Sequence, residues 1–214
     1  MPSLVIIDYG YGNVHSIVKA CEAVMPHGGQ VLLTADVDAI NQASHILLPG
    51  VGSFADCMQG INALPEVKHA LYHAVDNDNK PFLGICVGMQ LMASLGLEHG
   101  TTKGLGWFDA TVEKIPQTEG LVIPHMGWNN LIIEQAYADH PIFKGLAQEE
   151  HVYFVHSYYM HCKDNAYVAA SVDYGRRLPA VVIDRNRIGM QFHPEKSQQV
   201  GLTMLKNFLC IPSV

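Results

Sequence analysis

A cysteine between two glycines, in the pentapeptide Gly-Ile-Cys-Val-Gly at residues 84–88, limits most strongly what this chain can fold into. The apolar run 81–85 predicts a buried strand, and residues 87–92 predict the first turns of a helix. A cysteine on so sharp a strand-to-helix turn projects from the top of a sheet, and the helix N-terminus favours its thiolate form. The alternative is a structural cysteine packed in a strand, because buried cysteine often serves only as a small apolar residue.

The first half of the chain has the pattern of an α/β protein. Strands are expected at residues 4–7, 31–33, 45–48 and 81–85, and helices after Asn13, the expected N-cap, and at about 65–77. Strands that alternate with helices in this way are typical of a parallel, doubly wound sheet.

The second half has a different pattern. Strands are expected at residues 107–115, 121–124, 130–133, 152–155, 167–172, 180–184 and 188–192, followed by a helix at about 196–209. Because few helices intervene, this half is expected to be antiparallel or mixed. We therefore predict one domain over residues 1–214, with a central, mostly parallel sheet flanked by helices and an antiparallel extension in its second half.

Composition narrows the function classes. The formal net charge is −7 and lysine and arginine form no cluster, which disfavours nucleic acid or an anionic membrane as a partner. No apolar run approaches the roughly 18 residues needed to span a bilayer, and the N-terminus lacks the basic region of a signal peptide. The five cysteines are widely spaced and never form a Cys-x-x-Cys pair, which suits a reducing cytoplasm rather than a disulfide framework.

Among twelve histidines, His193 is the one whose surroundings predict a catalytic base. It ends an apolar strand, and Pro194 keeps it extended because a residue before proline avoids the helical region. Residues two apart in extended chain face the same side, about 6–7 Å apart, so the Glu195 carboxylate can reach the imidazole. The alternative is an exposed strand end with an incidental charge pair. The histidines at 151, 156 and 161 are five apart, a spacing that gathers no metal ligands, so no metal or cofactor is expected.

These residues together predict a Cys86–His193–Glu195 catalytic set for acyl transfer. The thiolate is expected to attack a carbonyl carbon, and the imidazole to carry the proton to the leaving amine. The carboxylate is expected to hold the imidazole in one tautomer.

The oxyanion of such a reaction needs backbone N–H donors. One is expected from Val87, directly after the nucleophile. The second is expected from Val51 in the loop Pro49–Gly52, where two glycines would let a peptide plane reorient. The alternative for this loop is an ordinary turn.

With these residues in view, the chain resembles the class I, or triad, glutamine amidotransferases. Six stretches over nearly the whole chain carry the resemblance: Asp8-Tyr9-Gly10-x-Gly12-Asn13, Pro49-Gly50-Val51-Gly52-x-Phe54, Gly84-Ile85-Cys86-x-Gly88-Met89-Gln90, His125-Met126-Gly127-Trp128-Asn129, Tyr153-Phe154-Val155-His156-Ser157-Tyr158 and Gln191-Phe192-His193-Pro194-Glu195-Lys196-Ser197. The second, fourth and sixth stretches are similar to those of the glutaminase subunits of imidazole glycerol phosphate synthases, which act in histidine biosynthesis. Val87 stands where leucine is usual, but it keeps a backbone N–H and an apolar side chain.

The resemblance implies that the chain hydrolyses glutamine to glutamate and ammonia through a thioester on the cysteine. It implies that four residues hold glutamine: Gly52, Gln90, Glu98 and Ser157. It also implies a heterodimer with a cyclase subunit, a (β/α)8 barrel that receives ammonia and makes imidazole glycerol phosphate and an aminoimidazole carboxamide ribotide. Five residues correspond to positions that face this partner: Asn13, Met126, Trp128, Tyr153 and Lys196.

Glutaminase activity is expected to be low without the loaded partner, because free ammonia would be protonated and lost. A movable loop at 49–52 is a physical candidate for this control, since one oxyanion donor is worth roughly 3–4 kcal/mol. Two other functions remain open: a glutaminase subunit of a different synthase, and a non-catalytic partner-binding module on the same fold.

Overall fold

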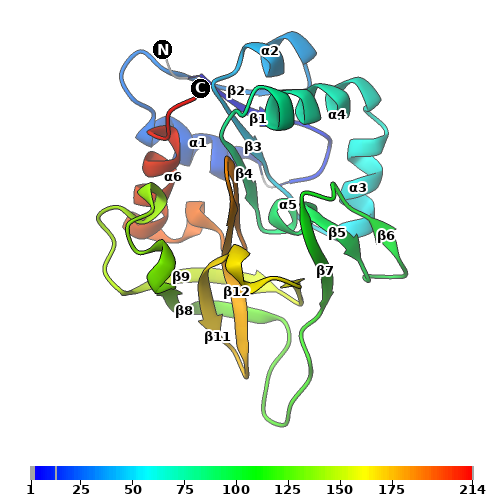
Figure 1. The fold of residues 1–214 in the computed structure, drawn as a ribbon, viewed down its shortest axis with the longest axis vertical. Helices are drawn as coiled ribbons and strands as arrows, with labels where there is room; N and C mark the ends of the chain where they lie inside the picture. Colours follow the sequence, from blue (N-terminus) through cyan, green and yellow to red (C-terminus); the bar gives the residue numbers. More distant parts are fainter. Residues whose placement is uncertain (1–2, 13, 214) are drawn as a thin grey trace.

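A computed structural model describes residues 3–12 and 14–213, so the predictions made for Asn13 lie outside the described residues. A nine-stranded sheet has the strand order β2-β1-β3-β4-β13-β12-β11-β8-β9 (Figure 1). Its first five strands pair in parallel, and the pairs from β13 to β9 are antiparallel. The predicted α/β fold, with a mostly parallel centre and an antiparallel extension, is therefore confirmed.

The parallel half has short apolar strands that are buried except at the edge strand β2. The strands are β1 (Ser3–Ile7), β2 (Gln30–Thr34), β3 (His45–Leu48), β4 (Phe82–Ile85) and β13 (Arg187–Met190). Helices α1 (Val14–Val24) and α6 (Gln198–Leu209) pack together on one side of the sheet (Figure 1). On the other side lie α2 (Val37–Gln42) and α4 (Pro65–Tyr72), and α3 (Phe54–Asn62) lies beside α4. Helix α4 continues as a π-helical turn at His73–Asn77.

The antiparallel half joins a second, four-stranded sheet of order β10-β7-β5-β6. The antiparallel strands are β12 (Arg177–Asp184), β11 (Val168–Asp173), β8 (His125–Ile133) and β9 (Glu149–His156). The second sheet consists of β5 (Ala93–Gly96), β6 (Thr102–Lys103), β7 (Phe108–Lys114) and β10 (Tyr158–Cys162). Short 3-10 turns lie at Gln135–Tyr137, Pro141–Phe143, Asn165–Tyr167 and Pro194–Lys196.

Two predicted elements were wrong. Residues 121–124 form no strand, because Gly120, with φ of 79°, and a bond from the Leu121 N–H to the Thr118 carbonyl make a turn there. Pro124 in addition has no N–H to donate to a ladder. The helix expected at 87–92 ends at Gln90, because the chain enters β5 three residues later.

Two helices and three short strands were missed by the sequence analysis. Helix α2 is capped by Asp36, whose carboxylate accepts from the Ala39 N–H at 2.9 Å. Helix α3 is capped by Ser53, whose hydroxyl accepts from the Asp56 N–H at 3.1 Å. Strands β5, β6 and β10 are defined by pairing within the second sheet, which the local sequence does not reveal.

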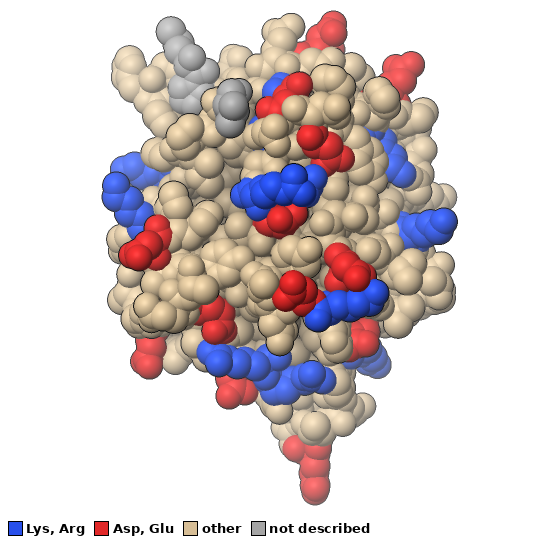
Figure 2. Space-filling model, viewed as in Figure 1, with Lys and Arg blue, Asp and Glu red and all other residues tan. Residues whose placement is uncertain are grey.

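No helix within the described residues is long and apolar enough to cross a membrane. Acidic and basic side chains lie interspersed over the face shown in Figure 2. The described residues on that face therefore make no continuous basic surface of the kind that binds nucleic acid.

Candidate active site

Cys86 lies on the turn between β4 and the short helix α5 (Val87–Gln90). Its φ of 54° is in a region that residues other than glycine rarely adopt, a strain of about 1–3 kcal/mol that is typical of active sites. The flanking glycines allow the turn to form: a Cβ on Gly88 would overlap the Leu48 carbonyl oxygen, and a Cβ on Gly84 would lie 2.6 Å from the Gly88 oxygen. Strain and close backbone contact together present this sulfur at the top of the sheet.

His193 and Glu195 form the pair that their spacing predicts. Nδ1 of His193 lies 2.8 Å from Oε1 of Glu195, and the two side chains are only 7% and 5% exposed. The backbone of His193 is extended, with φ of −96° and ψ of 100°. Its N–H donates to the Tyr153 carbonyl, and its own carbonyl accepts from the Ser197 hydroxyl. The backbone of His193 is therefore held on both sides, and Glu195 orients the imidazole.

The electrostatics of this pair favour a charged imidazole. Burial lowers the pKa of His193, but its interactions with Cys86 and Glu195 outweigh burial and raise the pKa to about 10. An imidazolium beside a thiol favours the thiolate, which is the form of cysteine that attacks a carbonyl carbon.

Cys86, His193 and Glu195 line one cavity of about 390 Å³, a volume within the range of small-molecule sites. The same cavity is lined by all the residues that we expected to hold the oxyanion or glutamine: Gly52, Val51, Val87, Gln90, Glu98 and Ser157. The fold thus brings together side chains from five separate stretches of sequence.

Two of these lining residues are oriented by hydrogen bonds. Oε2 of Glu98 accepts from the Phe54 N–H, in the first turn of α3, at 2.8 Å. Nε2 of Gln90 donates to the Tyr158 carbonyl at 2.9 Å and to Oε1 of Gln191 at 3.0 Å.

Gln191 is a neighbour of the sulfur that the sequence analysis did not identify. It is fully buried, and its Nε2 donates to Sγ of Cys86 at 3.8 Å while its Oε1 accepts from Gln90. A hydrogen bond to a charged acceptor is stronger than one to a neutral acceptor, so this amide stabilises the thiolate. The sequence does hold a signal for it: a glutamine within the apolar run before His193, where a polar side chain needs a partner.

The described residues of the expected partner face form one group of exposed and half-buried side chains, which we call the β8–β9 cluster: Met126, Trp128, Tyr153 and Lys196. Met126 and Trp128 on β8 are 61% and 47% exposed. Tyr153 is paired with Trp128 across the β8–β9 ladder, with ring centroids 5.9 Å apart. Nζ of Lys196 lies 5.8 Å from the Tyr153 ring centroid, and Lys196 also lines the cavity of Cys86. The cluster therefore borders the candidate active site.

The buried histidines His125 and His156 pair with each other and are not placed to bind a metal ion. Within residues 3–12 and 14–213, no group of three or more His, Cys, Asp and Glu side chains is placed to hold a metal ion. His156 instead pairs with His125, with Nδ1 of His125 3.0 Å from Nε2 of His156. Burial lowers the pKa of each to about 4, so both rings are neutral at pH 7.

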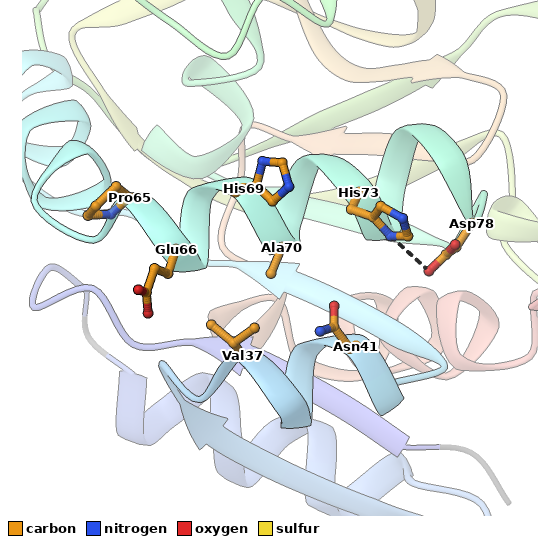
Figure 3. A pocket seen from close by; sticks show the side chains of 8 residues that line it. All are labelled: Val37, Asn41, Pro65, Glu66, His69, Ala70, His73 and Asp78. Carbon is orange, nitrogen blue, oxygen red and sulfur yellow. Dashed lines mark ion pairs between the residues drawn. The ribbon is translucent and has the colours of Figure 1, made fainter.

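A larger cavity of about 650 Å³ lies between α2 and α4 (Figure 3). His69 and His73, which line it, are exposed, and His73 pairs with Asp78 at 3.5 Å. None of the predicted site residues lines this cavity. The strained cysteine and the raised histidine pKa, rather than volume, therefore locate the candidate site.

Comparison with known proteins places the chain in a family. The family model for class I glutamine amidotransferases matches residues 5–211. The imidazole glycerol phosphate synthase subunit HisH of Ruegeria pomeroyi is 46% identical over 207 residues, which cover 95% of this chain and 96% of that protein. The chain belongs to the class I glutamine amidotransferases, among the HisH subunits. HisH of Agrobacterium fabrum is similarly related, at 47% identity over 211 residues, with 95% and 96% coverage.

Solved structures show how far the amidotransferase fold extends beyond these relatives. PurLQS from Thermotoga maritima has a TM-score of 0.71 at 20% identity and covers 97% of each chain. The glutaminase domain of CTPS from Trypanosoma brucei has a TM-score of 0.63 at 14% identity, with 97% and 94% coverage. At such low identity these structures are evidence for the fold alone, and they confirm the predicted class I amidotransferase architecture.

Proposed function

We propose that this chain is the glutaminase subunit of an imidazole glycerol phosphate synthase and that its reaction takes place on Cys86. The convergence of the strained Cys86, the His193–Glu195 pair and two oriented polar side chains in one cavity supports the assignment of the site. The names of the HisH relatives support the activity and the pathway.

In the proposed reaction, Sγ of Cys86 attacks the side-chain carboxamide carbon of glutamine. The N–H groups of Val87 and Val51 hold the oxyanion that forms. The C–N bond then breaks, and His193 gives its proton to the nitrogen, which leaves as ammonia. The remaining γ-glutamyl thioester is attacked by water, His193 takes up a proton, and the C–S bond breaks to release glutamate. Glu195 holds the imidazole throughout.

The substrate is held by groups on the wall of the same cavity. The negative charge of Glu98 suits the α-ammonium group of glutamine, and Gln90, Ser157 and Gly52 supply polar groups beside it. Hydrogen bonds already orient Glu98 and Gln90, which reduces the ordering that binding requires.

The ammonia is consumed by a partner. We propose a heterodimer with a (β/α)8-barrel cyclase that meets the β8–β9 cluster and Asn13, receives ammonia through a channel and makes imidazole glycerol phosphate and an aminoimidazole carboxamide ribotide. Two large exposed apolar side chains in the cluster support a protein interface there. We further propose that residues 1–214 act as one domain and that the enzyme works in the cytoplasm, where its five free cysteines would stay reduced.

Cys86→Ala in the assembled synthase tests the proposal. We expect glutamine-dependent turnover to fall by about 10⁴-fold or more, as when a nucleophile is removed, while added ammonium salt still supports the cyclase. Cys162→Ala, which removes another buried thiol, is the matched control and should keep both activities. Release of glutamate at the normal rate by Cys86→Ala would show that the nucleophile is misassigned.

A further inference from the structure

Two buried side chains that belong to no predicted site hold the loop at 49–52. Tyr9, in the segment after β1, donates from its hydroxyl to the Pro49 carbonyl at 2.7 Å. Cys57, on α3, donates from its thiol to the Val51 carbonyl at 3.4 Å. Tyr9 is 5% exposed and Cys57 is fully buried. The Tyr9 bond is itself buried, and the Cys57 bond is part-buried because Val51 is 37% exposed.

Both side chains keep their protons at neutral pH. Burial raises the pKa of Tyr9 far above its usual value and raises that of Cys57 to about 11. Each is therefore a donor. Removal of the Tyr9 hydroxyl leaves the buried Pro49 carbonyl oxygen without its partner, which is costly. Removal of the Cys57 thiol leaves the part-buried Val51 carbonyl without its side-chain donor.

The two bonds fall on either side of the peptide that the reaction would use. The loop has three peptide units: Pro49–Gly50, Gly50–Val51 and Val51–Gly52. Tyr9 holds the carbonyl of the first unit, and Cys57 holds the carbonyl of the third. The Val51 N–H, which is the expected second oxyanion donor, belongs to the unit between them.

A peptide plane turns through the two torsions that flank it, here ψ of Gly50 and φ of Val51, and the neighbouring planes can stay in place. Gly50 supplies the freedom that this rotation needs. Its Cα also packs on the elbow, since a Cβ there would lie 2.6 Å from the Gly88 nitrogen and 2.9 Å from Cβ of Val87. The middle peptide thus adjoins the residue expected to give the first oxyanion donor.

We infer that Tyr9 and Cys57 are positioning residues that fix the outer two peptide units of the loop and leave the Gly50–Val51 unit to set the direction of the Val51 N–H. The inference rests on the proposed function, in which that N–H stabilises the oxyanion. It differs from a role in core packing, because it requires the hydroxyl and the thiol as donors rather than as volume.

Tyr9→Phe and Cys57→Ala test the inference in the assembled synthase with saturating glutamine. We expect each to lower kcat roughly tenfold with KM unchanged, less than the 10²–10³-fold loss of a whole oxyanion donor. Cys57→Ser, which keeps a donor, should restore most of kcat. Tyr72→Phe, which loses a hydroxyl bond to the Leu105 carbonyl, and Cys162→Ala are the matched controls and should keep kcat.

Hydrogen exchange of the amides at residues 50–52 in the free chain provides a second readout, which does not depend on turnover. Tyr9→Phe should speed exchange in this loop more than Tyr72→Phe does. Wild-type kcat and unchanged exchange in both Tyr9→Phe and Cys57→Ala would overturn the inference. An inactive wild-type synthase would instead overturn the proposed function, and faster loop exchange would then still support the positioning role.

Discussion

The two halves of the nine-stranded sheet contribute different things to the candidate site. The parallel half supplies Cys86 after β4, the 49–52 loop after β3, and His193 beyond β13, all at the carboxyl ends of strands, where ligands bind in such sheets. The antiparallel half supplies Met126, Trp128 and Tyr153 of the β8–β9 cluster, on a face that reaches solvent, as one face of an antiparallel sheet can.

The difference lies in what fixes each set of groups. In the parallel half, close backbone contacts and a strained φ leave little choice of residue, as at Gly88 and Cys86. In the antiparallel half, exposed side chains such as Trp128 extend from a regular ladder that does not depend on them. Substitutions at such contacts in the first half should therefore change stability and kcat, and substitutions of the exposed side chains of the β8–β9 cluster should change partner binding alone.

The largest effect is expected for Gly88→Ala. The added Cβ would overlap the Leu48 carbonyl, and backbone cannot move aside as the end of a flexible side chain can, so we expect a loss of about 3 kcal/mol or more in the free energy of unfolding. Gly120→Ala, at an open position with positive φ, should cost only about 1–2 kcal/mol. Urea unfolding measures both, and equal losses would contradict the tight packing of the elbow.

An effect on turnover alone is expected for Glu195→Gln. Without the carboxylate the imidazole loses its orienting partner, and kcat should fall by roughly 10²–10⁴-fold, as in other triads. The pKa of His193 should also fall. In the wild type this pKa is raised, so the stabilisation of the imidazolium is complete below about pH 6.5 and is lost as the pH rises through about 10.

The pH profile of kcat/KM in the assembled synthase checks this second prediction. The alkaline limb of Glu195→Gln should lie at lower pH than that of the wild type. Superimposed profiles would mean that the carboxylate does not act on His193.

The smallest effect on the chain itself is expected for Trp128→Ala in the β8–β9 cluster. Its exposed ring should matter to the partner rather than to the fold, so Kd for the cyclase should rise about 30-fold, the roughly 2 kcal/mol of an interface hot spot, with no change in unfolding free energy. Leu32→Ala, at another exposed apolar residue on the edge strand β2, is the control. Calorimetric titration that gives equal affinities would remove the cluster from the interface.

Local sequence patterns predicted those parts of the candidate site whose geometry depends on residues adjacent in the chain. The turn at Cys86 follows from the glycines beside it, and the His193–Glu195 pair follows from a spacing of two residues with proline between. Helix α3 was also accessible, because Ser53 and Asp56 have the spacing of a helix cap, but no helix was predicted there.

Contacts between residues far apart in the chain could not be predicted from the sequence. Gln191 reaches the sulfur of Cys86 across 105 positions, and Tyr9 reaches the Pro49 carbonyl across 40. Their residue types are compatible with many roles, and only the packing of the sheet selects one. The short strand β10 was missed for the same reason, because its pairing partner, β7, is far away in sequence.

The proposed reaction requires a covalent bond between the substrate and Cys86. Rapid acid quench of the assembled synthase during glutamine turnover, followed by mass spectrometry of the peptide that contains Cys86, tests it directly. We predict a γ-glutamyl adduct on this cysteine, absent from Cys86→Ala and more abundant when the second half-reaction is slowed. Steady release of glutamate with no adduct on Cys86, or with the adduct on another of the five cysteines, would contradict the account.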